Sequence, residues 1–139
     1  TNLGMNYVTF DGNVAFTWLS PKGYELSFNT GYMVSTENEA TQYLSGQEFH
    51  VDWTAAYHVN EHFSLGAVGY AYAQTTPDSG AGAKLGDYMS SAAGIGPAVN
   101  YTAEMGGVDV VLEAKWLHDV AAVNRFSGDM VYGTFALKF

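Results

Sequence analysis

Apolar and polar residues alternate along much of the chain with a period of two, which is the side-chain period of a β-strand. In the segment 24–35, Tyr24 begins an apolar series on even positions and Glu25 begins a polar series on odd positions. The segments 48–59 and 130–139 repeat this pattern. These three segments are therefore predicted to be strands with one apolar and one polar face.

Four further segments show the same alternation more weakly, at 10–18, 63–74, 93–101 and 110–116. Both faces of 63–74 carry small or aromatic residues, so the pattern does not predict its facing. Pro97 has no N–H to donate to a ladder and is expected at a sheet edge or a bulge. The residues from Val110 also fit a helical stripe, but we favour a strand because the neighbouring segments are strands.

The predicted connections alternate between short and long along the chain. The short ones are 20–23, 60–62 and 103–107, and the long ones are 36–46, 75–89 and 121–128. Outer-membrane barrels have this rhythm of tight periplasmic turns and longer external loops. Strands of about ten residues also match the roughly 9 to 11 needed for a tilted membrane crossing. We therefore predict an all-β fold, an antiparallel up-and-down transmembrane β-barrel in the bacterial outer membrane.

The apolar face is expected to contact lipid, because lipid offers no hydrogen bonds and only a closed sheet with an apolar exterior is stable there. Aromatic residues gather near the strand ends, as in the girdles of membrane barrels. The expected lipid-facing and girdle residues are Trp18, Tyr24, Phe28, Phe49, Trp53, Tyr57, Trp116, Phe135 and Phe139. A soluble ligand-binding β-barrel, with this face inside, is the alternative.

Seven strands are an odd number, whereas bacterial single-chain barrels have an even number. An open sheet would also leave two unpaired edges in lipid. We therefore expect residues 1–139 to be a single barrel segment, the C-terminal part of a larger barrel. Another chain or a missing N-terminal part would supply the remaining strands. Alternatively, residues 1–6 form a short eighth strand.

The composition excludes several classes of protein. Only five residues are Lys or Arg and the formal net charge is -9, so the chain cannot neutralise a nucleic-acid backbone. Cysteine is absent, which excludes disulfides and thiol chemistry. No apolar run approaches the length of a transmembrane helix.

Several short stretches resemble one known family. They include 45–50, the loop around 78–86, Gly96-Pro97 with the residues to Tyr101, and Lys115-Trp116-Leu117-His118 followed by Asn124-Arg125. The chain resembles the SphA-like outer-membrane proteins associated with the MetA pathway of phenol degradation, over the C-terminal part of the family's usual length. Phe139, at the end of an alternating strand, is similar to the signal read by the barrel-assembly machinery. The resemblance implies a channel or transporter for passive uptake of small, aromatic or hydrophobic compounds.

The polar face supplies the candidate functional residues. The expected lumen-lining residues are Asp11, Asn13, Glu25, Asn29, Glu48, His50, Asp52, His58, Asn100, Glu113, Lys115, Asp119 and Lys138. Acidic groups dominate this set, so the lining favours cations and neutral polar solutes. A narrow lumen would instead be plugged by the same groups, in a structural or partner-binding barrel.

No enzyme is predicted, because no spacing singles out a nucleophile and no Gly-x-Ser-x-Gly elbow occurs. Glu48, His50 and Asp52 lie in a row about 13 Å long, from roughly 3.3 Å per residue, which is too spread for one metal ion. No cofactor or metal is therefore expected. The expected partners are the lipid bilayer, lipopolysaccharide and the remaining strands of the barrel.

Overall fold

The protein is described by a computed structural model in which residues 6–139 are placed. The part of the chain described contains seven strands: β1 (Thr9–Leu19), β2 (Tyr24–Ser35), β3 (Glu48–His58), β4 (Phe63–Gln74), β5 (Ser91–Met105), β6 (Val108–Val123) and β7 (Asp129–Lys138). The seven predicted strands are confirmed, including β6, for which a helix was the alternative. The alternative of a short eighth strand at residues 1–6 falls almost wholly outside the described residues.

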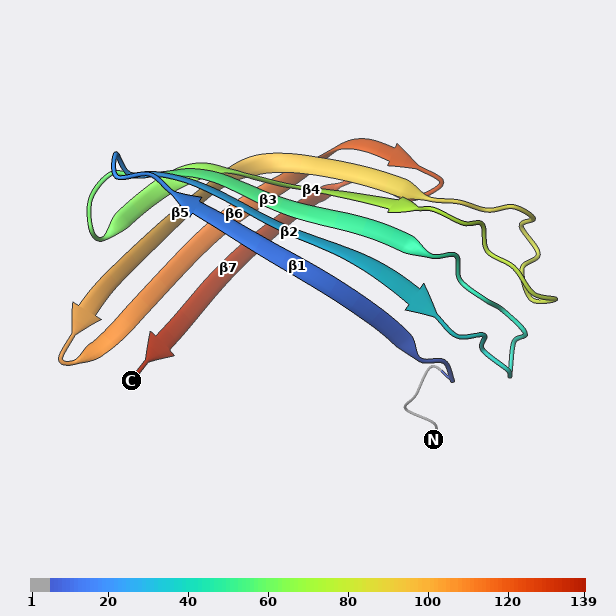
Figure 1. The fold of residues 1–139 in the computed structure, drawn as a ribbon. Coiled ribbons are helices and arrows are strands. Elements are labelled where there is room, and N and C mark those ends of the chain that lie inside the picture. Colours follow the sequence, from blue (N-terminus) through green and yellow to red (C-terminus); the bar gives the residue numbers. More distant parts are fainter. Residues whose placement is uncertain (1–5) are drawn as a thin grey trace.

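All seven strands belong to one antiparallel sheet in the order β1-β2-β3-β4-β5-β6-β7, so each strand pairs with its neighbours along the chain. Figure 1 shows this sheet as a curved layer, with the long loops gathered at one end. Within the described residues, β1 and β7 form its two edges and do not pair with each other. The up-and-down all-β topology is as predicted, and the sheet is not closed into a barrel.

The hairpin between β5 and β6 is tighter than the sequence suggested. Residues 103–105 continue β5, and Met105 pairs directly with Val108. Gly106 and Gly107 alone make the turn, with φ angles of 64° and 83°. Two consecutive positive φ angles match the twist of a two-residue hairpin, and glycine adopts them without steric cost.

Pro97 lies within an interior strand and not at a sheet edge. It pairs with Ala67 of β4, but the β5–β6 pairing is interrupted between Ile95 and Ala98. The missing N–H of proline therefore falls where the ladder is already open. A Cβ on the preceding Gly96 would lie 1.6 Å from the carbonyl oxygen of Trp116, so the two backbones approach closely here. The Gly-Pro pair thus fits a local irregularity of β5 against β6.

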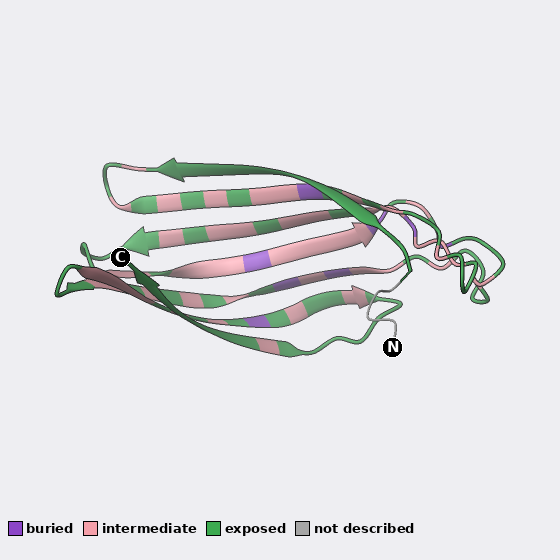
Figure 2. Cartoon of the chain, turned by 90° about the horizontal axis from the view of Figure 1, so that it is seen from below, coloured by how far each residue is buried: buried purple, intermediate pink, exposed green. Residues whose placement is uncertain are grey.

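The two faces of the sheet differ in exposure, most clearly in β2, β5 and β6. The polar positions of these strands are mostly half-buried, and the apolar positions are mostly exposed. Figure 2 shows this alternation of exposed and less exposed residues along the strands. Phe28, Phe49 and Phe135 are 40%, 43% and 65% exposed. This distribution, with large apolar side chains exposed and polar ones half-buried, is the reverse of that in a water-soluble protein.

Among residues 6–139, the only buried hydrophobic residues are Ala92 and Leu117, and no large side chain is fully buried. The sheet therefore has no core between two layers. No helix in this part of the chain is long and apolar enough to cross a membrane.

Candidate functional site

The pairing register brings all thirteen predicted lumen-lining residues to one face of the sheet. For example, Asn29 pairs with Asp52, and Asn100 pairs with Glu113. Directly paired residues project to the same side of the sheet. The pairing and the alternation along each strand together identify the residues of this face in all seven strands. The residues on this face, called the inner face below, are Asp11, Asn13, Glu25, Asn29, Glu48, His50, Asp52, His58, Asn100, Glu113, Lys115, Asp119 and Lys138.

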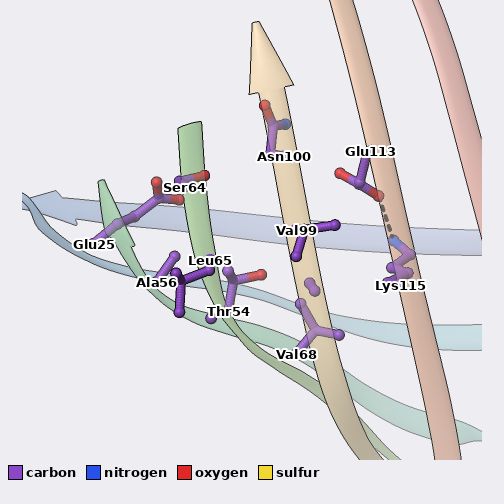
Figure 3. A pocket seen from close by; sticks show the side chains of 12 residues that line it. Glu25, Thr54, Ala56, Ser64, Leu65, Val68, Val99, Asn100, Glu113 and Lys115 are labelled. Atoms are coloured by element: carbon purple, nitrogen blue, oxygen red, sulfur yellow. Dashed lines mark ion pairs between the residues drawn. The ribbon is translucent and has the colours of Figure 1, made fainter. Parts of the chain in front are cut away.

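A hollow of about 180 Å³ lies on the inner face and is lined by residues of β2 to β6. The small residues Ala56, Gly66 and Ala98 pair in one row beneath it. Figure 3 shows Glu25 on one side of this hollow, and Glu113 and Lys115 on the other. Small side chains in the middle and longer polar side chains on both sides therefore create the concavity.

The charged groups around this hollow are partly compensated by their neighbours. Lys115 Nζ lies 3.2 Å from Glu113 Oε1. Glu25 accepts a hydrogen bond of 2.8 Å from the Ser27 hydroxyl, and its other oxygen lies 2.8 Å from His58 Nε2. The hollow therefore presents paired charges to a solute.

One pair on the inner face spans two strands across a glycine. His50 Nε2 on β3 lies 3.1 Å from Asp11 Oδ1 on β1. Gly31 of β2 stands between these strands and pairs with both Asn13 and His50. A Cβ at Gly31 would lie 2.4 Å from Asn13 Oδ1 and 2.4 Å from His50 Nε2. The absence of a side chain at Gly31 therefore lets the histidine reach the aspartate.

A second crossing repeats this arrangement further along the sheet. The Tyr70 hydroxyl on β4 donates to Asp119 Oδ1 on β6. Gly94 of β5 pairs with both residues, and a Cβ there would lie 2.4 Å from Tyr70 Cε1. Asp119 also accepts a hydrogen bond from the backbone N–H of Gly128, at 3.1 Å. The two crossings join β1 to β3 and β4 to β6 through side chains alone.

The opposite side of the sheet, called the outer face below, is apolar. The predicted lipid-facing residues that lie in strands on this face are Trp18, Tyr24, Phe28, Phe49, Trp53, Tyr57, Trp116 and Phe135. Phe139 follows β7 directly and is 95% exposed. The Trp53 ring covers Gly69, since a Cβ at that glycine would lie 2.5 Å from the ring.

Within the seven described strands, His118 and Asp129 are the only charged or imidazole side chains on the outer face. They lie toward the long-loop end of the neighbouring strands β6 and β7, with His118 Nδ1 3.0 Å from Asp129 Oδ1. Trp116 Nε1 donates to the same oxygen at 2.9 Å. The rest of this face offers apolar side chains and backbone to its surroundings.

Residues 1–135 match the model of the protein family described as "Putative MetA-pathway of phenol degradation". The chain belongs to this family. The resemblance predicted from short sequence stretches is thereby confirmed. No curated protein and no solved structure matches the chain.

The inner face of this family member also carries residues that the sequence did not assign to it. Tyr70 and Tyr72 lie there because they pair with Asp52 and His50. Both belong to the segment 63–74, for which the sequence did not predict which residues lie on which face. Arg125, the single arginine of the chain, lies in the loop after β6 with its guanidinium carbon 5.2 Å from the centre of the Tyr72 ring.

The long loops are held by a buried carboxylate. Asp78 is 7% exposed and accepts hydrogen bonds from the backbone N–H of Gly46 at 2.9 Å and from Gln74 Nε2 at 2.7 Å. The Tyr43 hydroxyl donates to its second oxygen. Burial, followed by the hydrogen bond to Asp78, raises the pKa of Tyr43 from 10.0 to about 12.

The acidic and imidazole side chains do not assemble a metal centre in the part of the chain described, where no three potential ligands lie together. Glu48, His50 and Asp52 follow one another along β3, and the acidic partner of His50 is Asp11 on another strand. This row of residues therefore supplies one histidine–aspartate pair and not a three-ligand site.

Proposed function

We propose that the chain forms part of the wall of a transmembrane β-barrel in the bacterial outer membrane, and that this barrel is a passive channel for small compounds. The observation that carries the proposal is the inversion of the two faces. Large apolar side chains lie on the more exposed outer face, and every strand carboxylate except that of Asp129 lies on the inner face with its hollow. Such a sheet is stable when hydrocarbon covers the outer face and water fills the inner side.

The edges of the sheet extend the proposal. In lipid, each unpaired backbone N–H or C=O costs several kcal/mol, so β1 and β7 require partners. In the complete barrel these edges pair with further strands, from the same polypeptide or from another copy. The lipid bilayer and lipopolysaccharide contact the outer face.

The inner face supports a preference for particular solutes. Its carboxylates outnumber its lysines, so the wall attracts cations, admits neutral molecules and repels anions. The family's connection with phenol degradation supports small aromatic compounds as the transported class. The proposal assigns no catalytic step to the chain.

A second candidate is a barrel whose lumen is blocked by its own side chains, with a structural or partner-binding role. The side-chain contacts between His50 and Asp11 and between Tyr70 and Asp119 favour it. Such networks hold polar side chains in place and fill space. The conducting and the blocked barrel share the same membrane wall and differ only in whether solutes pass.

Planar-bilayer recording of the complete protein tests the proposal. If the protein is a channel, it should give stepwise currents. Under a salt gradient, the reversal potential should shift toward the equilibrium potential of the cation. The double variant Glu25→Gln and Glu113→Gln should reduce this cation preference, whereas Glu37→Gln, in a loop, should leave it near the wild-type value. Protein that inserts into the bilayer and stays silent would overturn the channel in favour of the blocked barrel.

A further inference from the structure

The long loops enclose a second cavity, apart from the inner face. It has a volume of about 170 Å³ and is formed where the loop 36–47 meets the loop 75–90. Leu44 and Ser79 exchange backbone hydrogen bonds of 2.9 Å, and Gly82 N–H donates to the Gln42 carbonyl at 2.8 Å. The two loops are therefore joined by backbone contacts, and the cavity has a defined shape.

Aromatic and small apolar residues form much of the wall of this cavity. Tyr43 and Tyr88 contribute rings, and Ala83 and Leu85 contribute aliphatic groups. The Tyr88 hydroxyl donates to the backbone carbonyl of Asn124, which fixes this ring against the neighbouring loop. Flat aromatic walls favour an aromatic guest through stacked and edge-to-face contacts.

The one carboxylate in the wall is already engaged. Both oxygens of Asp78 accept hydrogen bonds from protein groups, one of which is the Tyr43 hydroxyl. The wall also contains Lys84, so one carboxylate and one ammonium group leave it without net charge, as suits a neutral guest. The engaged oxygens of Asp78 give a cationic guest little hydrogen-bonding capacity. Because Tyr43 donates its proton to Asp78, its oxygen keeps lone pairs that can accept a hydrogen bond.

Two large apolar side chains at this end of the sheet are highly exposed, one in the cavity wall and one on the neighbouring loop 124–128. Leu85 is 78% exposed and Phe126 is 98% exposed. The Asn124 side chain donates to the Met89 carbonyl at 2.6 Å, so the short loop 124–128 lies beside the end of the loop 75–90. Leu85, a residue of the cavity wall, is therefore accessible to a guest from solution.

We infer that the loop cavity between Tyr43, Ala83, Leu85 and Tyr88 binds one small neutral aromatic molecule bearing a hydroxyl group. The inference deepens the proposed function and rests on it, because a membrane barrel carries its long loops at the external end, where a solute enters. A volume of about 170 Å³ suits a single ring, since pockets for drug-sized ligands are roughly 300–1,000 Å³. The cavity thus captures the solute before it reaches the inner face.

Phenol is the probe for the test, measured by saturation-transfer NMR on the full chain in detergent micelles, with empty micelles as the reference. The wild type should give a saturable signal. Ala83→Phe, which fills the cavity, should weaken binding by about tenfold or more. The matched control Ala81→Phe adds the same side chain at an exposed position outside the cavity wall and should bind phenol as the wild type does.

Leu85→Ser provides a second variant that does not depend on fitting a ring into the loops. Its side chain is largely exposed, so folding should be unaffected, and phenol binding should weaken by about threefold. Cyclohexanol tests the aromatic requirement and benzoate tests the neutral requirement. Both should bind several-fold more weakly than phenol.

A phenol signal equal to that of empty micelles, or one that Ala83→Phe leaves unchanged, would overturn the inference. Equal binding of benzoate or cyclohexanol would overturn the assigned ligand class. Because the experiment measures binding at the loops without any current, a silent bilayer recording would contradict the channel and leave this result independent of it.

Discussion

On the inner face, side chains from strands that are not neighbours are joined across glycines, whereas the outer face carries large apolar side chains that are mostly exposed. Gly31 and Gly94 are crowded by inner-face side chains, while Gly12 and Gly133 on the outer face have nothing within 4 Å of a Cβ. Several polar groups of the inner face, such as those of His50 and Asp119, find partners within the sheet. The outer face depends on an apolar surrounding, which is why the two faces should respond differently to the same change.

The largest effect is expected from placing a charge on the outer face. Trp53→Lys puts an ammonium group where we expect hydrocarbon, at a cost of about 2–4 kcal/mol near the midplane of the bilayer. It also uncovers Gly69. The variant should fail to insert into lipid vesicles, as measured by heat-modified migration on gels.

The matched control for this variant is the adjacent inner-face residue. Asp52 is exposed, and Asp52→Asn removes a charge from the side that we expect to face water. Its insertion should be close to that of the wild type. Equal insertion of the Trp53→Lys and Asp52→Asn variants would contradict the assignment of the faces.

A smaller effect is expected from a methyl group in one of the glycine crossings. Gly31→Ala should displace the ends of His50 and Asn13 and separate His50 from Asp11. The variant loses this side-chain contact between β1 and β3 and should be less stable than the wild type. The difference should appear as a lower midpoint of urea unfolding in vesicles.

Gly12→Ala is the control, because Gly12 lies on the neighbouring strand β1 and faces open space. Surface substitutions of this kind usually stay within about 0.5 kcal/mol. If the two alanine variants unfold at the same urea concentration, the crossing at Gly31 has no energetic role.

The smallest effect is expected in the long loops. There, unlike on either face of the sheet, a carboxylate is buried, that of Asp78. The pKa of Tyr43 rises to about 12 from 10.0, so the folded state favours the protonated phenol. The resulting stabilisation is complete below pH 10 and is lost as the pH rises toward 12. Ultraviolet titration should therefore show Tyr43 ionising late.

Tyr43→Phe removes that late step and should leave the remaining titration unchanged. Asp78→Asn removes the carboxylate that accepts from Tyr43 and should lower the pKa of Tyr43 toward its ordinary value. If the wild type and Tyr43→Phe release the same number of tyrosine protons between pH 10 and 12, the shift does not belong to Tyr43.

Much of the wall was predictable from the sequence, because the period of two fixes both the strand and the face of each residue. The segment 24–35 alternates strictly and corresponds to β2 without a change of bounds. The facing of β4 was not predictable, since Tyr70 and Gly69 are adjacent and neither face is distinctly polar. Only its register with β3 places Tyr70 beside Asp52.

The side-chain contacts between strands that are not neighbours could not be predicted from the local alternation of residues. His50 and Asp11 are 39 positions apart, and Tyr70 and Asp119 are 49 apart. Each contact requires a glycine in a third strand at one particular register. The engagement of Asp78 by Tyr43, Gly46 and Gln74 likewise depends on how two loops fold together.

Site-directed spin labelling tests the inversion of the faces most directly. The chain contains no cysteine, so a single label can be placed at Phe28→Cys or at Asn29→Cys, on adjacent residues of β2. In lipid vesicles, the account predicts that the label at position 28 collides mainly with dissolved oxygen, which concentrates in hydrocarbon. The label at position 29 should collide mainly with a water-soluble nickel complex. The opposite preference, or no difference between the two labels, would contradict a wall with lipid outside and water inside.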